Sequence, residues 1–110
     1  MKKYCLALDL KEDDALIAEY EKYHQQVWPE IIESIKSSGI TSLEIYRISN
    51  RLFMIIEAQD EFTFEKKNQA DMINLKVQQW EVLMWQYQQA LPCAKPREKW
   101  LLMNKIFEMK

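Results

Sequence analysis

The spacing of the apolar residues changes between two periods along the chain, and the order of these changes restricts the fold to few arrangements. Residues 3–10 place apolar side chains at every second position, which is typical of a strand with one buried face. Residues 15–36 carry them three or four apart, as a helix does, and Pro29 predicts that this helix is divided. Gly39 follows at a position where glycine often ends a helix.

The second part of the chain shows a similar succession. Residues 41–48 and 52–58 are expected to form two strands joined by a hairpin. Helical spacing begins at Asp60, with a break near Asp71, and ends before Pro92, and residues 98–109 are expected as a last strand. This β-α-β-β-α-β order predicts an α+β, ferredoxin-like antiparallel sheet with the helices on one face. We expect residues 1–110 to form one domain, since this length suffices for one core.

Two of the expected strands are apolar on both faces, which bears on assembly. An antiparallel sheet with one wet face should alternate apolar and polar residues, but residues 52–56 and 100–103 do not. Phe53 and Leu101 would therefore be exposed on an isolated monomer. The alternative is that a loop or a terminal extension covers this face of the sheet, but the expected elements already use most of the 110 residues. We therefore expect a homodimer through the sheet face, in an assembly of the dimeric α/β-barrel type.

Composition and charge exclude several classes of function. The formal net charge is −2 and basic residues do not cluster, so a nucleic-acid partner is not expected. No apolar run approaches the length of a bilayer, so no membrane partner is expected. A single glycine, Gly39, excludes the glycine-rich loops that bind nucleotide phosphates. Cys5 and Cys93 form no disulfide framework or CxxC pair, which favours reduced thiols in the cytoplasm.

The chain contains one histidine, His24, with Tyr20 four residues before it and Trp28 four residues after it. Residues four apart share a helix face, so the three are expected to lie in one row. An imidazole can accept and donate a proton near neutral pH, which makes His24 the candidate catalytic group. The alternative is a hydrogen-bonded histidine of the core. No His, Cys or Asp lies at metal-ligand spacing from His24, so no metal is expected.

The segment around this histidine resembles that of a known family. Residues 20–30 are similar to the Tyr-x-x-x-His-x-x-x-Trp-Pro-Glu segment of the L-rhamnose mutarotases, and the similarity continues over nearly the whole chain. The resemblance implies a ferredoxin-like homodimer that needs no cofactor and interconverts the α and β anomers of a deoxy sugar. It implies that His24 transfers the proton and that Tyr20 and Trp80 bind the sugar.

Some further residues are candidate sugar contacts, and two positions differ from the family pattern in ways that bear on the substrate. We add Trp28, Tyr46 and Glu81 as candidate sugar contacts. Where the family has a tyrosine on the second strand this chain has Leu43, and the family's paired tryptophans appear here as Trp80–Glu81. Polar contacts of this kind discriminate between sugar epimers, so L-fucose is a rival to L-rhamnose.

For the mechanism we expect His24 to protonate the ring oxygen as general acid. Tyr20, a water molecule or Glu81 would relay the proton of the anomeric hydroxyl. Two other functions stay open on the residues alone. One is a dimeric small-molecule-binding module without catalysis. The other is a cofactor-independent monooxygenase of the same dimeric architecture, with a histidine and a tryptophan in its pocket.

Overall fold

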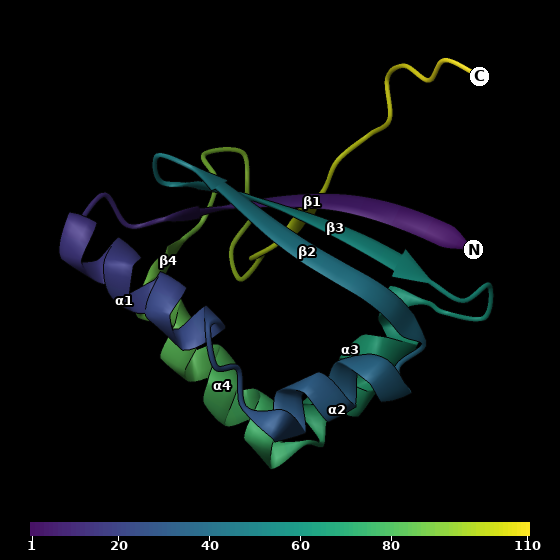
Figure 1. Cartoon of the computed structure of the whole chain (residues 1–110), viewed down its shortest axis with the longest axis horizontal. Coiled ribbons are helices and arrows are strands. Elements are labelled where there is room, and N and C mark those ends of the chain that lie inside the picture. Colours follow the sequence, from purple (N-terminus) through teal and green to yellow (C-terminus); the bar gives the residue numbers. More distant parts are fainter.

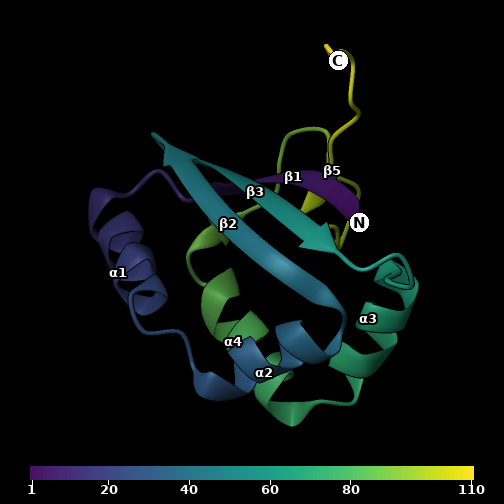
Figure 2. The same cartoon turned by 45° about the vertical axis from the view of Figure 1, so that its right-hand side comes forward.

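The computed structural model describes all residues, 1–110, as a sheet with four helices on one side. Figures 1 and 2 show the helices below the sheet, while the C-terminal residues extend away from it on the opposite side. None of the four helices combines the length and apolar character needed to cross a bilayer. The elements in chain order are β1 (Lys2–Leu10), α1 (Asp14–His24), α2 (Pro29–Ser37), β2 (Ile40–Ile48), β3 (Arg51–Ala58), α3 (Phe64–Met72), α4 (Leu75–Trp85), β4 (Gln88–Gln89) and β5 (Leu101–Leu102).

The sheet has the strand order β2-β3-β1, with β4 and β5 both paired to β1, and every pairing is antiparallel. The hairpin of β2 and β3 turns at Ser49 and Asn50, as the sequence predicted. In the central pair, Leu8 lies opposite Leu52 and Leu6 opposite Met54, and all four side chains are buried under the helices. The ferredoxin-like antiparallel sheet with helices on one face is therefore confirmed.

Both expected helix breaks are present, and each has a local cause. Trp28 has extended backbone angles, φ −55° and ψ 134°, because the ring of Pro29 disfavours helical geometry in the residue before it. The second break follows Met72, where the Asn74 side chain accepts a hydrogen bond from the Val77 amide and starts α4. Each of the two expected helices is therefore a pair of short helices.

The last expected strand was wrong in extent. Only Leu101 and Leu102 pair with β1, and residues 104–110 continue without a neighbouring strand. Asparagine and lysine, at 104 and 105, are poor strand residues. The apolar residues of this segment could not show that a partner strand was missing. The sequence also did not predict β4, which lies beyond the end of α4 and pairs with the end of β1.

The core lies between the sheet and the helices, in two adjoining clusters. One lies under α1 and α4 and includes Leu10, Tyr20 and Trp80. The other lies at the opposite end of the sheet and includes Leu6, Met54 and Phe62. Burying this face requires one side chain in two from each strand to face the helices, which matches the period that residues 3–10 showed.

The opposite face of the sheet carries a row of apolar side chains across four strands. Register places Tyr46 of β2 beside Phe53 of β3, Phe53 beside Ala7 of β1, and Ala7 beside Leu101 of β5. Phe53 and Leu101 are half-buried, not fully exposed as expected, because neighbours in the same row shield each other. Tyr46 remains 53% exposed.

Candidate functional site

Helix α1 brings the two central site residues together. The carboxylate of Asp13 caps the helix by accepting a hydrogen bond from the amide of Leu16, at 3.1 Å. Tyr20 and His24 then lie one turn apart, and their rings stack with centroids 4.4 Å apart. His24 is the last residue of the helix, so its half-buried side chain lies at the point where the chain leaves α1. The predicted Tyr20–His24 pair is therefore present.

The His24 ring has a defined proton position. Its Nδ1 lies 2.8 Å from the backbone carbonyl oxygen of Tyr20. A carbonyl oxygen can only accept a hydrogen bond, so Nδ1 is the donor and carries a hydrogen. In the neutral imidazole the lone pair is then on Nε2. The ring can therefore act as a proton acceptor through Nε2 while α1 itself holds its orientation.

The Tyr20 hydroxyl is buried and has a partner that sequence reasoning missed. Tyr20 is only 3% exposed, and its oxygen accepts a hydrogen bond from Nε2 of Gln88 at 3.3 Å. Burial raises the pKa of Tyr20 from 10.0 to about 12, although the Gln88 hydrogen bond opposes this rise. The phenol therefore stays protonated at neutral pH. Gln88 comes from β4, whose pairing with β1 could not be inferred from local spacing.

Aromatic rings surround this pair, with Trp80 at their centre. The Trp80 ring lies edge-on to His24 at 5.8 Å and edge-on to Trp28 at 5.1 Å between centroids. Tyr23 and Tyr87 complete the cluster, and Tyr87 lies 6.3 Å from Tyr20. Trp28 is in the cluster although it lies outside α1. Edge-to-face packing of this kind leaves ring faces that suit the apolar side of a sugar.

Two predicted contacts are not in this cluster. Tyr46 lies on the opposite face of the sheet from the His24 cluster, where its hydroxyl donates to the Glu44 carboxylate at 3.2 Å. The cause is strand alternation, because Ile45 takes the face toward the helices. Glu81 is half-buried on α4, about 100° round the helix from Trp80. Leu43 packs against the second core cluster.

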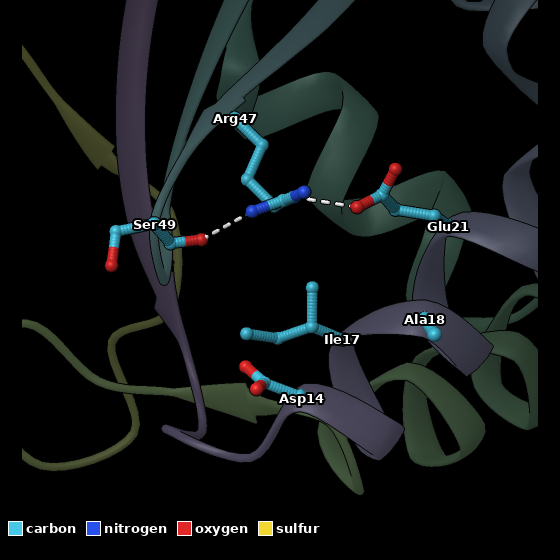
Figure 3. A pocket seen from close by; sticks show the side chains of 6 residues that line it. All are labelled: Asp14, Ile17, Ala18, Glu21, Arg47 and Ser49. Carbon is cyan, nitrogen blue, oxygen red and sulfur yellow. Dashed lines mark hydrogen bonds and ion pairs between the residues drawn. The ribbon is translucent and has the colours of Figure 1, made fainter.

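A cavity of about 300 Å³ lies between α1 and the end of β2, and its lining is largely polar (Figure 3). Arg47 donates from Nε to Oε1 of Glu21 at 2.6 Å and from Nη1 to the carbonyl of Ser49 at 2.7 Å. The sequence did not single out Glu21 as a site residue. Its partner Arg47 comes from an edge strand, so spacing within α1 could not identify it. The full lining is Asp14, Ile17, Ala18, Glu21, Arg47 and Ser49.

The fold and the site define a small ferredoxin-like domain in which a histidine with an acceptor nitrogen, a buried phenol and two tryptophans lie together. Residues 3–109 match the L-rhamnose mutarotase family, and the chain belongs to that family. It is accordingly an isomerase that acts on a carbohydrate and interconverts sugar anomers.

Particular relatives make this membership concrete. The chain is 40% identical over 111 residues to an L-fucose mutarotase of Xanthomonas campestris pv. campestris, covering 99% of this chain and 89% of the relative. It is 32% identical over 57 residues to an L-rhamnose mutarotase of Paraburkholderia phytofirmans, covering 50% of this chain and 53% of the relative. The crystal structure of an L-rhamnose mutarotase from Formosa agariphila superposes with a TM-score of 0.73 at 20% identity, covering both chains fully, which shows the common fold.

Proposed function

We propose that this protein interconverts the α and β anomers of a free 6-deoxy aldose, with L-fucose as the first substrate to test and L-rhamnose as the second. The observation that carries the proposal is His24, the single imidazole of the chain, held in one tautomer beside aromatic rings. L-fucose comes first because the similarity to the Xanthomonas campestris L-fucose mutarotase extends over nearly the whole chain. The similarity to the Paraburkholderia phytofirmans L-rhamnose mutarotase covers half of it.

Ring opening requires one proton to leave the anomeric hydroxyl and one to reach the ring oxygen. In our proposal Nε2 of His24 accepts the proton of the anomeric hydroxyl while the bond between C1 and the ring oxygen breaks and the aldehyde forms. The Tyr20 hydroxyl gives its hydrogen to the ring oxygen. Rotation about the C1–C2 bond presents the other face of the aldehyde, and the ring then closes. Both protons return along the same paths, so the enzyme ends unchanged.

This assignment exchanges the roles that the sequence suggested, in which His24 was the general acid. The hydrogen bond from Nδ1 to the Tyr20 carbonyl supports the exchange, because it leaves the neutral ring with an acceptor at Nε2. The donor from Gln88 supports it also, because a phenol oxygen that accepts a hydrogen bond keeps its own hydrogen for another acceptor. One acceptor and one donor within a helical turn are the pair that mutarotation needs.

The phenol suits this role despite its burial. A pKa of about 12 keeps Tyr20 protonated at neutral pH, yet its hydroxyl is still more acidic than the sugar alcohol that ring opening forms. Because Tyr20 is 3% exposed, we propose that the sugar parts the aromatic cluster as it binds. The rings of Trp80 and Trp28 would then stack on the apolar face of the pyranose, replacing the contact they make with each other.

We further propose that two copies pack through their open sheet faces. The apolar row of Tyr46, Phe53, Ala7 and Leu101 supports this, and so do the exposed apolar side chains near the end of the chain, Met103, Ile106, Phe107 and Met109. A two-fold dimer would place the same row on both partners. Analytical ultracentrifugation should give a dimer, and Phe53→Glu should shift it toward monomer. A wild-type monomer at micromolar concentration would refute the assembly.

The reaction is tested by saturation-transfer NMR of anomer exchange in L-fucose and L-rhamnose. His24→Ala should lower the catalysed rate by about 10²–10⁴-fold, the usual contribution of a general acid–base group. Gln25→Ala is the matched control, since Gln25 is the next residue and is exposed to solvent. It should retain the rate. Equal exchange with His24→Ala and wild type would remove His24 from the mechanism, and exchange no faster than in buffer with any 6-deoxy sugar would refute the function.

A further inference from the structure

The cavity between α1 and β2 lies close to the proposed catalytic pair. Glu21, in its lining, is three residues before His24 on α1, and side chains three apart on a helix have Cβ atoms about 5–6 Å apart. Helical side chains lean toward the N-terminus, and the His24 ring does so, stacking back on Tyr20. Ile17 lines the cavity and also packs against the core cluster that contains Tyr20. Ile17 and Glu21 thus connect the cavity to the part of α1 that carries the catalytic pair.

Arg47 enters this cavity from the sheet. Arg47 is two residues after Ile45 in β2, so both side chains point to the same face of the sheet, and Ile45 packs against the core. Arg47 also lies opposite the buried Leu52 of β3. Its side chain therefore points to the helix side and crosses the gap to Glu21 (Figure 3). The Ser49 carbonyl that holds Nη1 belongs to a residue with φ 51°, a left-handed conformation that serine adopts only when the surrounding turn requires it.

The ion pair contributes little to folding in this position, because both side chains are substantially exposed, 35% for Arg47 and 50% for Glu21. The charged groups of this ion pair are better suited to binding the hydroxyls of a polyol than to stabilising the fold. Nη2 of Arg47, Oε2 of Glu21 and the carboxylate of Asp14 are not used in the contacts just described. Neighbouring sugar hydroxyls can donate to a carboxylate and accept from a guanidinium at once, and such charge-assisted hydrogen bonds are strong and directional.

We infer that this cavity holds the hydroxyl-bearing side of the sugar whose anomeric carbon lies at His24, and that Arg47 and Glu21 are the residues that select among sugar epimers. The inference rests on the proposed function, which supplies the sugar. A volume of about 300 Å³ is at the small end of ligand pockets and has room for the hydroxyls on one side of a monosaccharide. Polar groups that must find hydroxyl partners discriminate much more strongly than apolar walls do.

The kinetic test replaces the guanidinium. Arg47→Met should raise KM for the preferred 6-deoxy sugar by about tenfold to a hundredfold, the value of a lost charged hydrogen bond, and leave kcat within about twofold. The ratio of kcat/KM values for L-fucose and L-rhamnose should move toward one. Glu21→Gln should act in the same direction. Lys22→Met is the matched control, since it removes a cation from the exposed side of the same helix.

A second measurement separates this inference from the proposed catalysis. The Nε–H of Arg47 should give a resolved ¹⁵N signal because it is hydrogen-bonded to Glu21. Adding L-fucose to the His24→Ala variant should shift that signal although no exchange occurs. A shift in a wild-type protein that does not catalyse exchange would refute the function but retain the cavity as a sugar site. An unmoved signal, or Arg47→Met kinetics equal to wild type, would overturn the inference.

Discussion

The buried phenol of Tyr20 should make the protein unstable in alkali, and Tyr20→Phe should remove much of this effect. Burial raises the pKa of Tyr20 from 10.0 to about 12. Unfolding exposes the phenol and restores its ordinary pKa of about 10. The folded state therefore binds the phenolic proton more tightly than the unfolded state does.

The sign and the size of the effect follow from proton linkage. A group whose pKa is raised by folding adds stability that is fully present below its unfolded pKa and is lost as the pH rises through the folded value. The loss from Tyr20 should thus begin near pH 10 and be complete above about pH 12. Each pKa unit corresponds to about 1.36 kcal/mol, so a shift of about two units costs about 2–3 kcal/mol. Small domains are stable by about 5–15 kcal/mol, so this loss is readily measured.

The assay is urea unfolding followed by tryptophan fluorescence, at about pH 8 and about pH 11.5, on either side of the ordinary tyrosine pKa. Wild type and variants are compared at one protein concentration, because the stability of an oligomer depends on it. Tyr20→Phe will lower the stability at both pH values by losing the Gln88 hydrogen bond. The difference between the two pH values is the quantity that isolates the phenol. Tyr4→Phe is the control, since Tyr4 packs against the other core cluster, away from Tyr20.

The reasoning would be refuted by a Tyr20→Phe variant that loses as much stability between the two pH values as wild type does. That result would mean that the phenol ionises as easily in the folded protein as in the unfolded chain. It would also weaken the proposed mechanism, in which Tyr20 gives its hydrogen to the sugar from a buried position beside Gln88 of β4. An ordinary pKa would mean that the folded protein does not hold the phenol in such a position.

Three further perturbations test contacts around the site and between the helices. Gln88→Leu should cost about 1–3 kcal/mol of unfolding free energy in urea, because it leaves the Tyr20 hydroxyl unpaired, and should raise the pKa of Tyr20 further. Asp71→Asn should also cost about 1–3 kcal/mol in urea, because Lys67 loses a buried counter-charge 2.6 Å away. Asn74→Ala should cost about 1 kcal/mol in thermal unfolding, since it removes the N-cap of α4, and circular dichroism should show that the helix still forms.

The sequence predicted most of the fold because its strands and helices each bury one face. In β1 the alternating Leu6, Leu8 and Leu10 are buried, and this period of two is directly visible in the chain. The break between α1 and α2 could also be predicted, since its cause is local: Pro29 disfavours helical geometry in the residue before it. The last strand could not be delimited, because the apolar residues of 101–109 are the same whether or not a neighbouring strand is there to pair with.

The site was predictable in part, for the same reason. Tyr20 and His24 are one helical turn apart, so helical spacing alone brings them together. Tyr46 lies apart from this pair because it takes the face of β2 opposite to Ile45, beside Phe53 of β3. Gln88 and Arg47 were missed because each meets its partner across the fold, 68 residues apart for Gln88 and Tyr20, and 26 for Arg47 and Glu21.

This division between near and distant contacts suggests how the enzyme can change its sugar without changing its reaction. The imidazole and the carbonyl that fixes its tautomer both belong to α1, so any chain that keeps this helix keeps the proton acceptor. The proposed epimer-selecting contact joins α1 to the edge strand β2, which has a neighbour on only one side and can vary without disturbing the central pairing of β1 and β3. Substitutions at position 47 should therefore alter the preferred sugar while the dependence of kcat on His24 persists.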